Sequence, residues 1–150
     1  MDCLFCRIIS HSEKSWIIYE DEHHIAFLTP FPNTPGFTVL VTREHLGSNV
    51  LEFDEDRYIE FMKTARTLAR HLKKKLRTKR IGLIIEGMGI DHAHIKLIPM
   101  HGIPDGDWKP MLSSVKEFAN IYKGYLTTND GPRMSDEELE KIQTLITSPF

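Results

Sequence analysis

The part of the chain that decides the fold reads IGLIIEGMGIDHAHIKLI, residues 81–98. It holds two apolar runs, 81–85 and 93–98, and the connection between them contains two glycines. Two such runs with a short glycine-bearing connection predict an antiparallel hairpin. Because side chains alternate between the faces of a strand, His92, His94 and Lys96 are expected on one face and the intervening apolar residues on the other. The hairpin therefore predicts one packed face and one face that presents two imidazoles and an ammonium.

Two interpretations of this polar face remain open from the hairpin alone. Gly87 and Gly89 would let backbone N–H groups approach a bound anion without an obstructing Cβ, which suits a phosphate. An antiparallel strand whose polar face simply lies in water shows the same alternation.

The segments before the hairpin predict an α+β domain. Strands are expected at 16–19, 25–28 and 37–42, and one or two helical turns near 3–9. Asp54 is a candidate N-cap for a long helix over 54–78. Apolar residues recur along it at helical spacing, and they are Ile59, Met62, Ala65, Leu68, Leu72 and Leu76.

The segments after the hairpin predict additional helices. One is expected over 114–125, and a last one begins at the capping box Ser135-Asp-Glu-Glu138. The apolar stripe of the last helix is Leu139, Ile142, Leu145 and Ile146. We therefore expect a domain at 1–101 and a helical extension at 102–150 packed on it.

The composition excludes several classes of protein. The chain has 150 residues, 19 Lys+Arg, 21 Asp+Glu and 41% hydrophobic residues, so it can bury a core without a disulfide scaffold. No run approaches the ~20 apolar residues of a membrane helix, and the first residues do not resemble a signal peptide. A net charge of -2 argues against a nucleic-acid partner. The basic run at 73–80 suits a solvated helix end. A cytoplasmic protein without a membrane partner is expected.

The pair Cys3-x-x-Cys6 is open to three interpretations: a redox pair, half of a metal site, or two buried thiols. A thioredoxin-like pair follows a strand, and only two residues precede Cys3. A tetrahedral zinc site would need two more nitrogen or sulfur ligands.

The motif strand and several earlier segments resemble the histidine-triad (HIT) superfamily of nucleotide hydrolases and transferases. The family signature is His-φ-His-φ-His-φ-φ, where φ is apolar, and residues 92–98 read HAHIKLI. Residues 3–9, CLFCRII, are similar to the family's N-terminal Cys-x-Phe-Cys-x-Ile-φ. Residues 25–28 and 35–45 are similar to its central strands and the histidine that follows. The resemblance covers residues 1–101.

The resemblance implies a HIT-like α+β fold, a mostly antiparallel sheet of about five strands with the long helix packed on it. It implies that His94 attacks the α-phosphate of a nucleotide or nucleotide conjugate and forms a covalent nucleotidyl-histidine, with Lys96 as a second catalytic residue. A histidine side chain, with an ordinary pKa of about 6.5, supplies a neutral nucleophile near neutral pH. The implied nucleotide-binding residues are Phe5, Ile8, Phe27, Thr29, Gly87 and Gly89. Family members are commonly homodimers, so a homodimer is expected.

Zinc-bearing members of the family imply a structural zinc here, with Cys3, Cys6, His45 and His92 as ligands. Holding His92 would also fix the strand that carries His94. For the other histidines, surface exposure is the default expectation; they are His11, His23, His24, His71 and His101.

Three departures from the family pattern keep alternative functions open. Lys96 replaces the third histidine, and a lysine suits charge stabilisation better than acid–base work because its ordinary pKa is about 10.4. Thr29 stands where a ribose-binding acid or amide is common, and Gly89 where a hydroxyl residue often binds phosphate. The leading hypothesis is a nucleoside phosphoramidase or dinucleoside-polyphosphate hydrolase. The alternatives are a nucleotidyl transferase or phosphorylase, and a zinc-stabilised nucleotide-binding or interaction protein with weak turnover.

Overall fold

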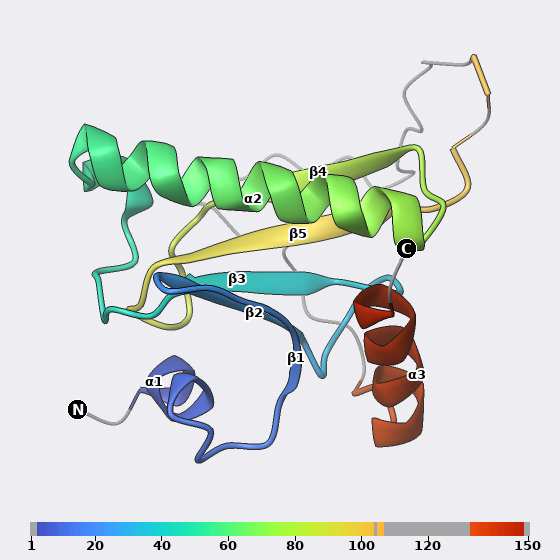
Figure 1. The fold of residues 1–150 in the computed structure, drawn as a ribbon, viewed down its shortest axis with the longest axis horizontal. Coiled ribbons are helices and arrows are strands. Elements are labelled where there is room, and N and C mark those ends of the chain that lie inside the picture. The colour runs from blue at the N-terminus through green and yellow to red at the C-terminus, as the bar shows by residue number, and fades with distance from the viewer. Residues whose placement is uncertain (1–2, 104, 107–132, 149–150) are drawn as a thin grey trace, which may run out of the picture.

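The computed structural model describes residues 3–103, 105–106 and 133–148 and confirms the expected α+β architecture (Figure 1). The elements predicted within these residues are present, with boundaries shifted by a few residues. The helices are α1 (Leu4–Ile9), α2 (Glu55–Lys75) and α3 (Asp136–Thr147), with a short 3-10 turn η1 (Val50–Glu52) before α2. The strands are β1 (Trp16–Glu20), β2 (His24–Leu28), β3 (Thr38–Thr42), β4 (Arg80–Ile84) and β5 (His94–Met100).

The five strands form one antiparallel sheet in the order β1-β2-β3-β5-β4. The hairpin predicted from residues 81–98 is confirmed, since Ile84 pairs with Lys96 and Gly82 with Ile98. On its other side β5 pairs with β3, which places Val39 beside Lys96 and Val41 beside His94. The motif strand is therefore an inner strand, and neighbours on both sides fix the direction of its side chains.

One face of the sheet, here called the α2 face, is fully packed. Helix α2 lies across it (Figure 1) and contributes the buried residues Phe61, Ala65, Leu68 and Leu72. The strand residues that meet them are Ala26, Leu28, Leu40, Ile95 and Leu97, all at most 1% exposed. Every second residue of β5 thus belongs to this core, as the alternation predicts.

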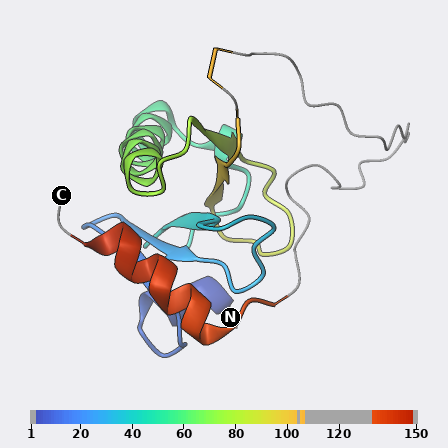
Figure 2. The same ribbon diagram turned by 90° about the vertical axis from the view of Figure 1, so that its right-hand side faces the viewer.

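The opposite face, here called the α1 face, is covered in part. Figure 2 shows α1 and α2 on opposite sides of the sheet. Phe5 and Ile8 of α1 pack on Ile25, Phe27 and Val39. Because α1 has 6 residues and α2 has 21, at about 1.5 Å per residue α1 spans roughly a third of the length of α2. A short helix leaves room for a cavity on this face.

Helix α2 differs from its prediction at its end and in its apolar stripe. Asp54 is the N-cap, and its carboxylate accepts a hydrogen bond from the Arg57 backbone N–H at 3.0 Å. The helix ends at Lys75 rather than at residue 78, because Arg77 adopts a left-handed backbone conformation with φ 54°. Within the stripe, Ile59 is 38% exposed, and Phe61 fills the core instead. The buried residues of α2 follow a helical spacing that begins at Phe61 rather than at Ile59, so spacing alone chose the wrong residue of the first turns.

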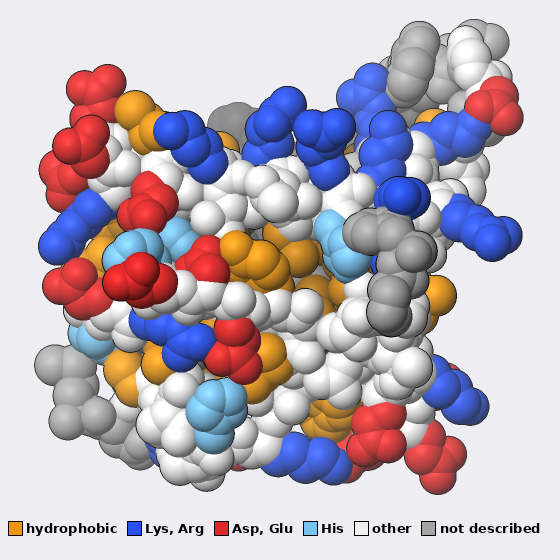
Figure 3. All heavy atoms as spheres, viewed as in Figure 1, with side chains coloured by type: hydrophobic (Ala, Val, Ile, Leu, Met, Phe, Trp, Pro, Cys, Tyr) orange, Lys and Arg blue, Asp and Glu red, His pale blue; other side chains and the backbone are white. Residues whose placement is uncertain are grey.

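Charges along α2 follow the helix dipole. Glu55 and Asp56 lie in its first turn and Lys73, Lys74 and Lys75 in its last. Figure 3 shows the acidic side chains gathered where α2 begins and the basic ones along and beyond its end. In the described part of the chain, no helix combines the length and apolarity that crossing a bilayer requires.

Helix α3 confirms the capping box and corrects part of the stripe. The Ser135 hydroxyl oxygen accepts from the Glu138 backbone N–H at 3.3 Å. Leu139 and Ile146 are buried in the core that α2 shares, but Leu145 is 47% exposed. Gln143 reaches β1, where its amide donates to the Ile17 carbonyl at 2.8 Å. The helix predicted over 114–125 lies outside the described residues, and the division into 1–101 and 102–150 stays a prediction.

Candidate functional site

His94 is the first residue of β5 and lies on the α1 face, 3% exposed. Its Nδ1 is 2.7 Å from the His92 carbonyl oxygen. Since a carbonyl only accepts, Nδ1 carries the proton and Nε2 keeps a free lone pair. Burial lowers the pKa of His94, and the Lys96 ammonium lowers it further, while the hydrogen bond to the His92 carbonyl and the Glu86 charge oppose the shift. The geometry and the electrostatics both favour a neutral imidazole.

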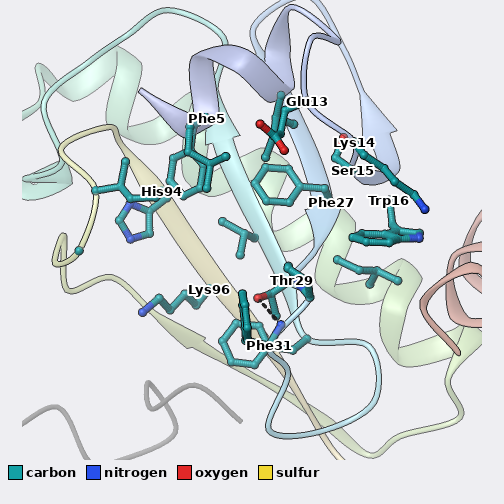
Figure 4. A pocket seen from close by; sticks show the side chains of 18 of the residues that line it. Phe5, Glu13, Lys14, Ser15, Trp16, Phe27, Thr29, Phe31, His94 and Lys96 are labelled. Carbon is teal, nitrogen blue, oxygen red and sulfur yellow. Dashed lines mark hydrogen bonds between the residues drawn. The ribbon is translucent and has the colours of Figure 1, made fainter. Parts of the chain in front are cut away.

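A cavity of about 810 Å³ opens on the α1 face beside His94. Figure 4 shows His94 and Lys96 toward one end and Trp16 toward the other, with Phe27 between them. The predicted nucleotide-binding residues that line this cavity are Phe5, Ile8, Phe27, Thr29 and Gly89. The volume is within the range of small-molecule sites, about 300–1,000 Å³.

Gly87 has a different place from the other predicted binding residues. It packs on the backbone of Ser48, where a Cβ would come within 2.7 Å of the Ser48 carbonyl oxygen, and its φ is +69°. Close approach between two backbones and a left-handed conformation both require glycine there. Gly89 also has a positive φ of +91°, but nothing lies within 4 Å of its Cβ position, and it faces the cavity.

Lys96 does not stand alone in the cavity. Its ammonium forms an ion pair with Oε1 of Glu86, and the two side chains are only 16% and 14% exposed. Glu86 follows the end of β4 by two residues and lines the same cavity as His94. The polar end of the cavity therefore contains a neutral imidazole and a pair of opposite charges.

Four potential metal ligands converge behind His94. The Sγ of Cys3 is 3.5 Å from Nδ1 of His92, and the Sγ of Cys6 is 3.6 Å from the same nitrogen and 3.2 Å from Nδ1 of His45. All four ligand atoms lie within 4.8 Å of one another. In a tetrahedral zinc site, bonds of about 2.3 Å to sulfur and 2.0 Å to nitrogen separate neighbouring ligands by roughly 3.6 Å. The donor set and its spacing fit zinc.

The orientation of His92 also suits a metal ligand. Its Nε2 donates to the Thr42 carbonyl oxygen at 2.7 Å, so Nδ1 has the free lone pair and faces the two cysteines. Burial lowers the pKa of His92, which keeps the ring neutral, and burial raises the pKa of the Cys6 thiol. The two histidines therefore have different surroundings: the His92 ring faces the two cysteines, and the His94 ring faces the cavity.

Known proteins share this sequence pattern. The pattern that defines the HIT domain matches residues 10–105. The chain belongs to the HIT domain family. A HIT-like protein of Saccharolobus solfataricus is 34% identical over 103 residues, which cover 65% of this chain and 73% of that protein. A relative from Saccharomyces cerevisiae, named adenosine 5′-monophosphoramidase, is 23% identical over 137 residues, 86% of this chain and 84% of that protein.

Solved structures share the fold of this HIT protein. A hypothetical histidine triad nucleotide-binding protein from Sulfolobus tokodaii superposes with a TM-score of 0.73 and 26% identity, over 97% of this chain and 89% of that one. A zinc-bound histidine triad family protein from Mycobacterium smegmatis gives a TM-score of 0.69 over 98% of this chain and 91% of that one, at 19% identity. At so low an identity, the second likeness concerns the fold alone.

Sequence reasoning missed part of the cavity of this HIT protein. Lys14 and Trp16 line the end away from His94, and Phe31 lines the cavity beside Thr29 (Figure 4). The Lys14 ammonium lies 5.3 Å from the centre of the Trp16 ring and pairs with Asp136 of α3 at 2.5 Å. In the sequence, Trp16 is only the first apolar residue of a predicted strand. Its place in the lining of the cavity depends on the packing of the folded chain, which no local pattern shows.

The default of surface exposure is wrong for two of the other histidines, because His24 is buried and His71 is half-buried. His24 is 3% exposed and stacks on Phe61 at 5.3 Å between ring centres. It lies on the α2 face because its partner in the register, Thr42, is on that face. His101 is exposed, as expected, and its Nε2 donates to the Pro35 carbonyl oxygen at 2.9 Å.

Proposed function

We propose that this HIT protein hydrolyses nucleotide conjugates, either nucleoside phosphoramidates or dinucleoside polyphosphates, through a covalent nucleotidyl-His94. The observation that carries the proposal is the free Nε2 of a neutral, buried imidazole at the wall of a nucleotide-sized cavity. The name of the Saccharomyces relative, an adenosine 5′-monophosphoramidase, supports the same class. An oriented imidazole with its other nitrogen anchored is the arrangement that nucleophilic catalysis requires.

The first chemical step forms a bond between Nε2 of His94 and the α-phosphorus. The bond from phosphorus to the leaving group breaks, and its electron pair goes to the leaving atom. When that atom is nitrogen, it takes a proton from the Lys96 ammonium and departs as an amine. Lys96 also stabilises the negative charge that grows on the phosphoryl oxygens, because opposite charges attract strongly in a partly buried site.

The second step restores the protein. Water attacks the phosphorus of nucleotidyl-His94 and the bond to Nε2 breaks. After a phosphoramidate, the proton released by water returns to Lys96, and the sum is one water consumed for one amine and one nucleoside monophosphate. After a dinucleoside polyphosphate, Lys96 has kept its proton, the proton released by water passes to the solvent, and the products are a nucleotide and a nucleoside monophosphate. Lysine suits charge stabilisation better than acid–base work when it must titrate freely near neutral pH. In the phosphoramidate reaction Lys96 need not titrate freely, because the proton that it gives to the leaving nitrogen in the first step returns to it in the second.

The apolar part of the cavity suits a nucleoside. Phe5 and Phe27 form a tilted aromatic pair with ring centres 5.7 Å apart, next to Ile8. Aromatic faces bind a base by stacking. The Thr29 hydroxyl oxygen accepts from the Phe31 backbone N–H at 3.2 Å, so its O–H is oriented toward other acceptors, which suits a ribose oxygen (Figure 4).

The proposal includes a structural zinc held by Cys3, Cys6, His45 and His92. Zinc would supply rigidity rather than a chemical step, because all four positions of a tetrahedral shell would be protein ligands. Its ligands join α1 to the residue two places before His94. The fit rests on the donor atoms, their spacing and the orientation of His92.

The proposal also includes a homodimer formed at β4. This strand is the last of the sheet, and Leu83 on it is 40% exposed. An edge strand with apolar side chains is suited to pair with a second copy. Sedimentation of the wild type should give twice the mass of one chain, and the Leu83→Lys variant should sediment with the mass of a single chain. A wild-type protein with the mass of a single chain contradicts the dimer.

The test of the hydrolase is His94→Gln, assayed with adenosine 5′-phosphoramidate and with diadenosine tetraphosphate. We expect the wild type to hydrolyse at least one of them, and the variant to lose on the order of 10³-fold or more in kcat/KM. Mass spectrometry of the quenched wild type should find an added nucleotidyl group on His94. His23→Gln is the matched control, since His23 is 57% exposed and lies outside the cavity.

Two results would contradict the hydrolase. If the wild type shows neither turnover nor an adduct on His94, the proposed hydrolase function is wrong. An adduct that forms but resists water, and is released by an added phosphate acceptor, assigns the protein to the transferases instead.

A further inference from the structure

The Lys96–Glu86 ion pair places a largely buried carboxylate at the reacting end of the cavity. Both side chains are largely buried and line the cavity with His94. A carboxylate beside a phosphate-binding position repels the phosphate unless another charge compensates it. A role for Glu86 in binding the substrate would explain a carboxylate at this position.

Counting charges indicates which leaving groups this end of the cavity favours. Among the described residues at this end of the cavity, Lys96 and Glu86 carry opposite charges that offset each other. A nucleoside phosphoramidate brings one negative charge at its α-phosphate. A polyphosphate leaving group brings several more and places them near the Glu86 carboxylate, whereas a cationic leaving group restores neutrality.

We propose that Glu86 is a specificity-determining residue that selects leaving groups carrying positive charge over neutral or polyanionic ones. The ligand class is a nucleoside phosphoramidate whose amine bears a second, cationic ammonium group. The proposal rests on the proposed function for its chemistry. The reaction is the one described above, with the bond from phosphorus to nitrogen broken and the proton supplied by Lys96.

The contact with Lys96 by itself allows a simpler role, in which Glu86 only orients the ammonium. The two roles differ in what they predict. An orienting residue affects every substrate by a similar factor, because Lys96 acts on the phosphoryl group that all of them share. A selecting residue affects cationic and neutral leaving groups differently.

The test uses two probes that differ by one charge and little in size: adenosine 5′-phosphoramidates with an N-(2-aminoethyl) or an N-propyl group. We expect the wild type to favour the aminoethyl probe by about 10-fold in kcat/KM, and Glu86→Gln to reduce the preference to about 2-fold or less. Diadenosine tetraphosphate should be a poorer substrate for the wild type and improve relative to both probes in the variant. Glu60→Gln is the control, since Glu60 is a half-exposed carboxylate on α2, and it should keep the preference.

Two further measurements separate this inference from the proposed function. Calorimetric affinities of both probes in a His94→Gln background report selection without turnover, and they should show the same preference with Glu86 and its loss in the double variant. The second requires no change at Glu86: in the wild type, 1 M salt, where the Debye length is about 3 Å, should shrink the preference.

The outcomes are distinct. Equal loss on both probes in Glu86→Gln, or no preference in the wild type and in the binding measurement, overturns the inference and leaves the hydrolase standing. A binding preference lost with Glu86, in a protein that hydrolyses neither probe, supports selection and removes the hydrolase.

Discussion

The two faces of the sheet differ although the same strands build both. On the α2 face, a helix of 21 residues closes the core, and Leu40, Ile95 and Leu97 are fully buried. On the α1 face, a helix of 6 residues leaves a cavity beside His94 and Lys96. Alternate residues of β5 therefore line the packed core and the cavity. The lesson is that a strand held rigidly by one packed face can present reactive groups in fixed positions on the other.

The largest effect expected from this comparison is on the α2 face. Leu40→Ala should lower the free energy of unfolding by about 3 kcal/mol, because it opens a void in a closed core. Its neighbour on the other face, Val39→Ala, should cost about 1 kcal/mol, since Val39 already borders the cavity. Denaturant unfolding measures both.

The order of the two effects should be reversed for nucleotide affinity, where Val39→Ala should have the larger effect and Leu40→Ala the smaller. Val39→Ala is expected to change AMP affinity and Leu40→Ala to leave it unaltered, measured by calorimetry. If the two variants lost the same stability and bound AMP with the same affinity, the distinction between a closed core on the α2 face and a cavity on the α1 face would be contradicted.

Metal removal should affect the α1 face next most strongly. If zinc at 100 times its dissociation constant is removed by a chelator, the protein should lose about 2.7 kcal/mol of stability. Hydrogen exchange should rise first in α1, because Cys3 and Cys6 connect it to His45 and His92. Cys3→Ser should reduce zinc content and make the melting temperature insensitive to chelator.

The matched variant for the metal is Thr67→Ser on the surface of α2, which should leave the response to chelator intact. A wild-type protein that contains no zinc and ignores the chelator contradicts the metal site.

The smallest effect is a dependence on pH at the turn between β1 and β2. Burial raises the pKa of Asp21, but the hydrogen bonds from the Tyr19 hydroxyl and from the His23 and His24 backbone N–H groups outweigh it and lower the pKa overall. Burial, together with the bond to Asp21, raises the pKa of Tyr19 to about 12. A lowered carboxyl pKa stabilises the fold above the unfolded value of about 3.9, and this is lost as the pH falls through the folded pKa.

Asp21→Asn should therefore cost about 1 kcal/mol at pH 7. The difference from the wild type should vanish in strong acid, as measured by urea unfolding across pH 2 to 7. If the difference in the free energy of unfolding between the wild type and Asp21→Asn stayed the same in acid, the charge of the Asp21 carboxylate would not contribute to that difference.

Much of this molecule follows from local patterns. The alternation of 92–98 predicted which side chains share a face, and the register of β3, β4 and β5 confirms it. Capping residues predicted the starts of α2 and α3 because a side-chain oxygen satisfies a free N–H within three residues. The position of Phe61, in contrast, escaped the helical pattern, since the depth of a helix residue depends on what the helix packs against.

The sequence by itself determined the hairpin, the order of the elements and the residue types able to hold a metal or attack phosphorus, because these depend on spacing along the chain. Only the tertiary structure decided that Cys3 lies 3.5 Å from a residue 89 places away, that His24 is buried, and that Glu86 pairs with Lys96. Those facts depend on the lengths of α1 and α2 and on which strands are neighbours, and no local pattern records the distance between segments that meet only in the folded chain.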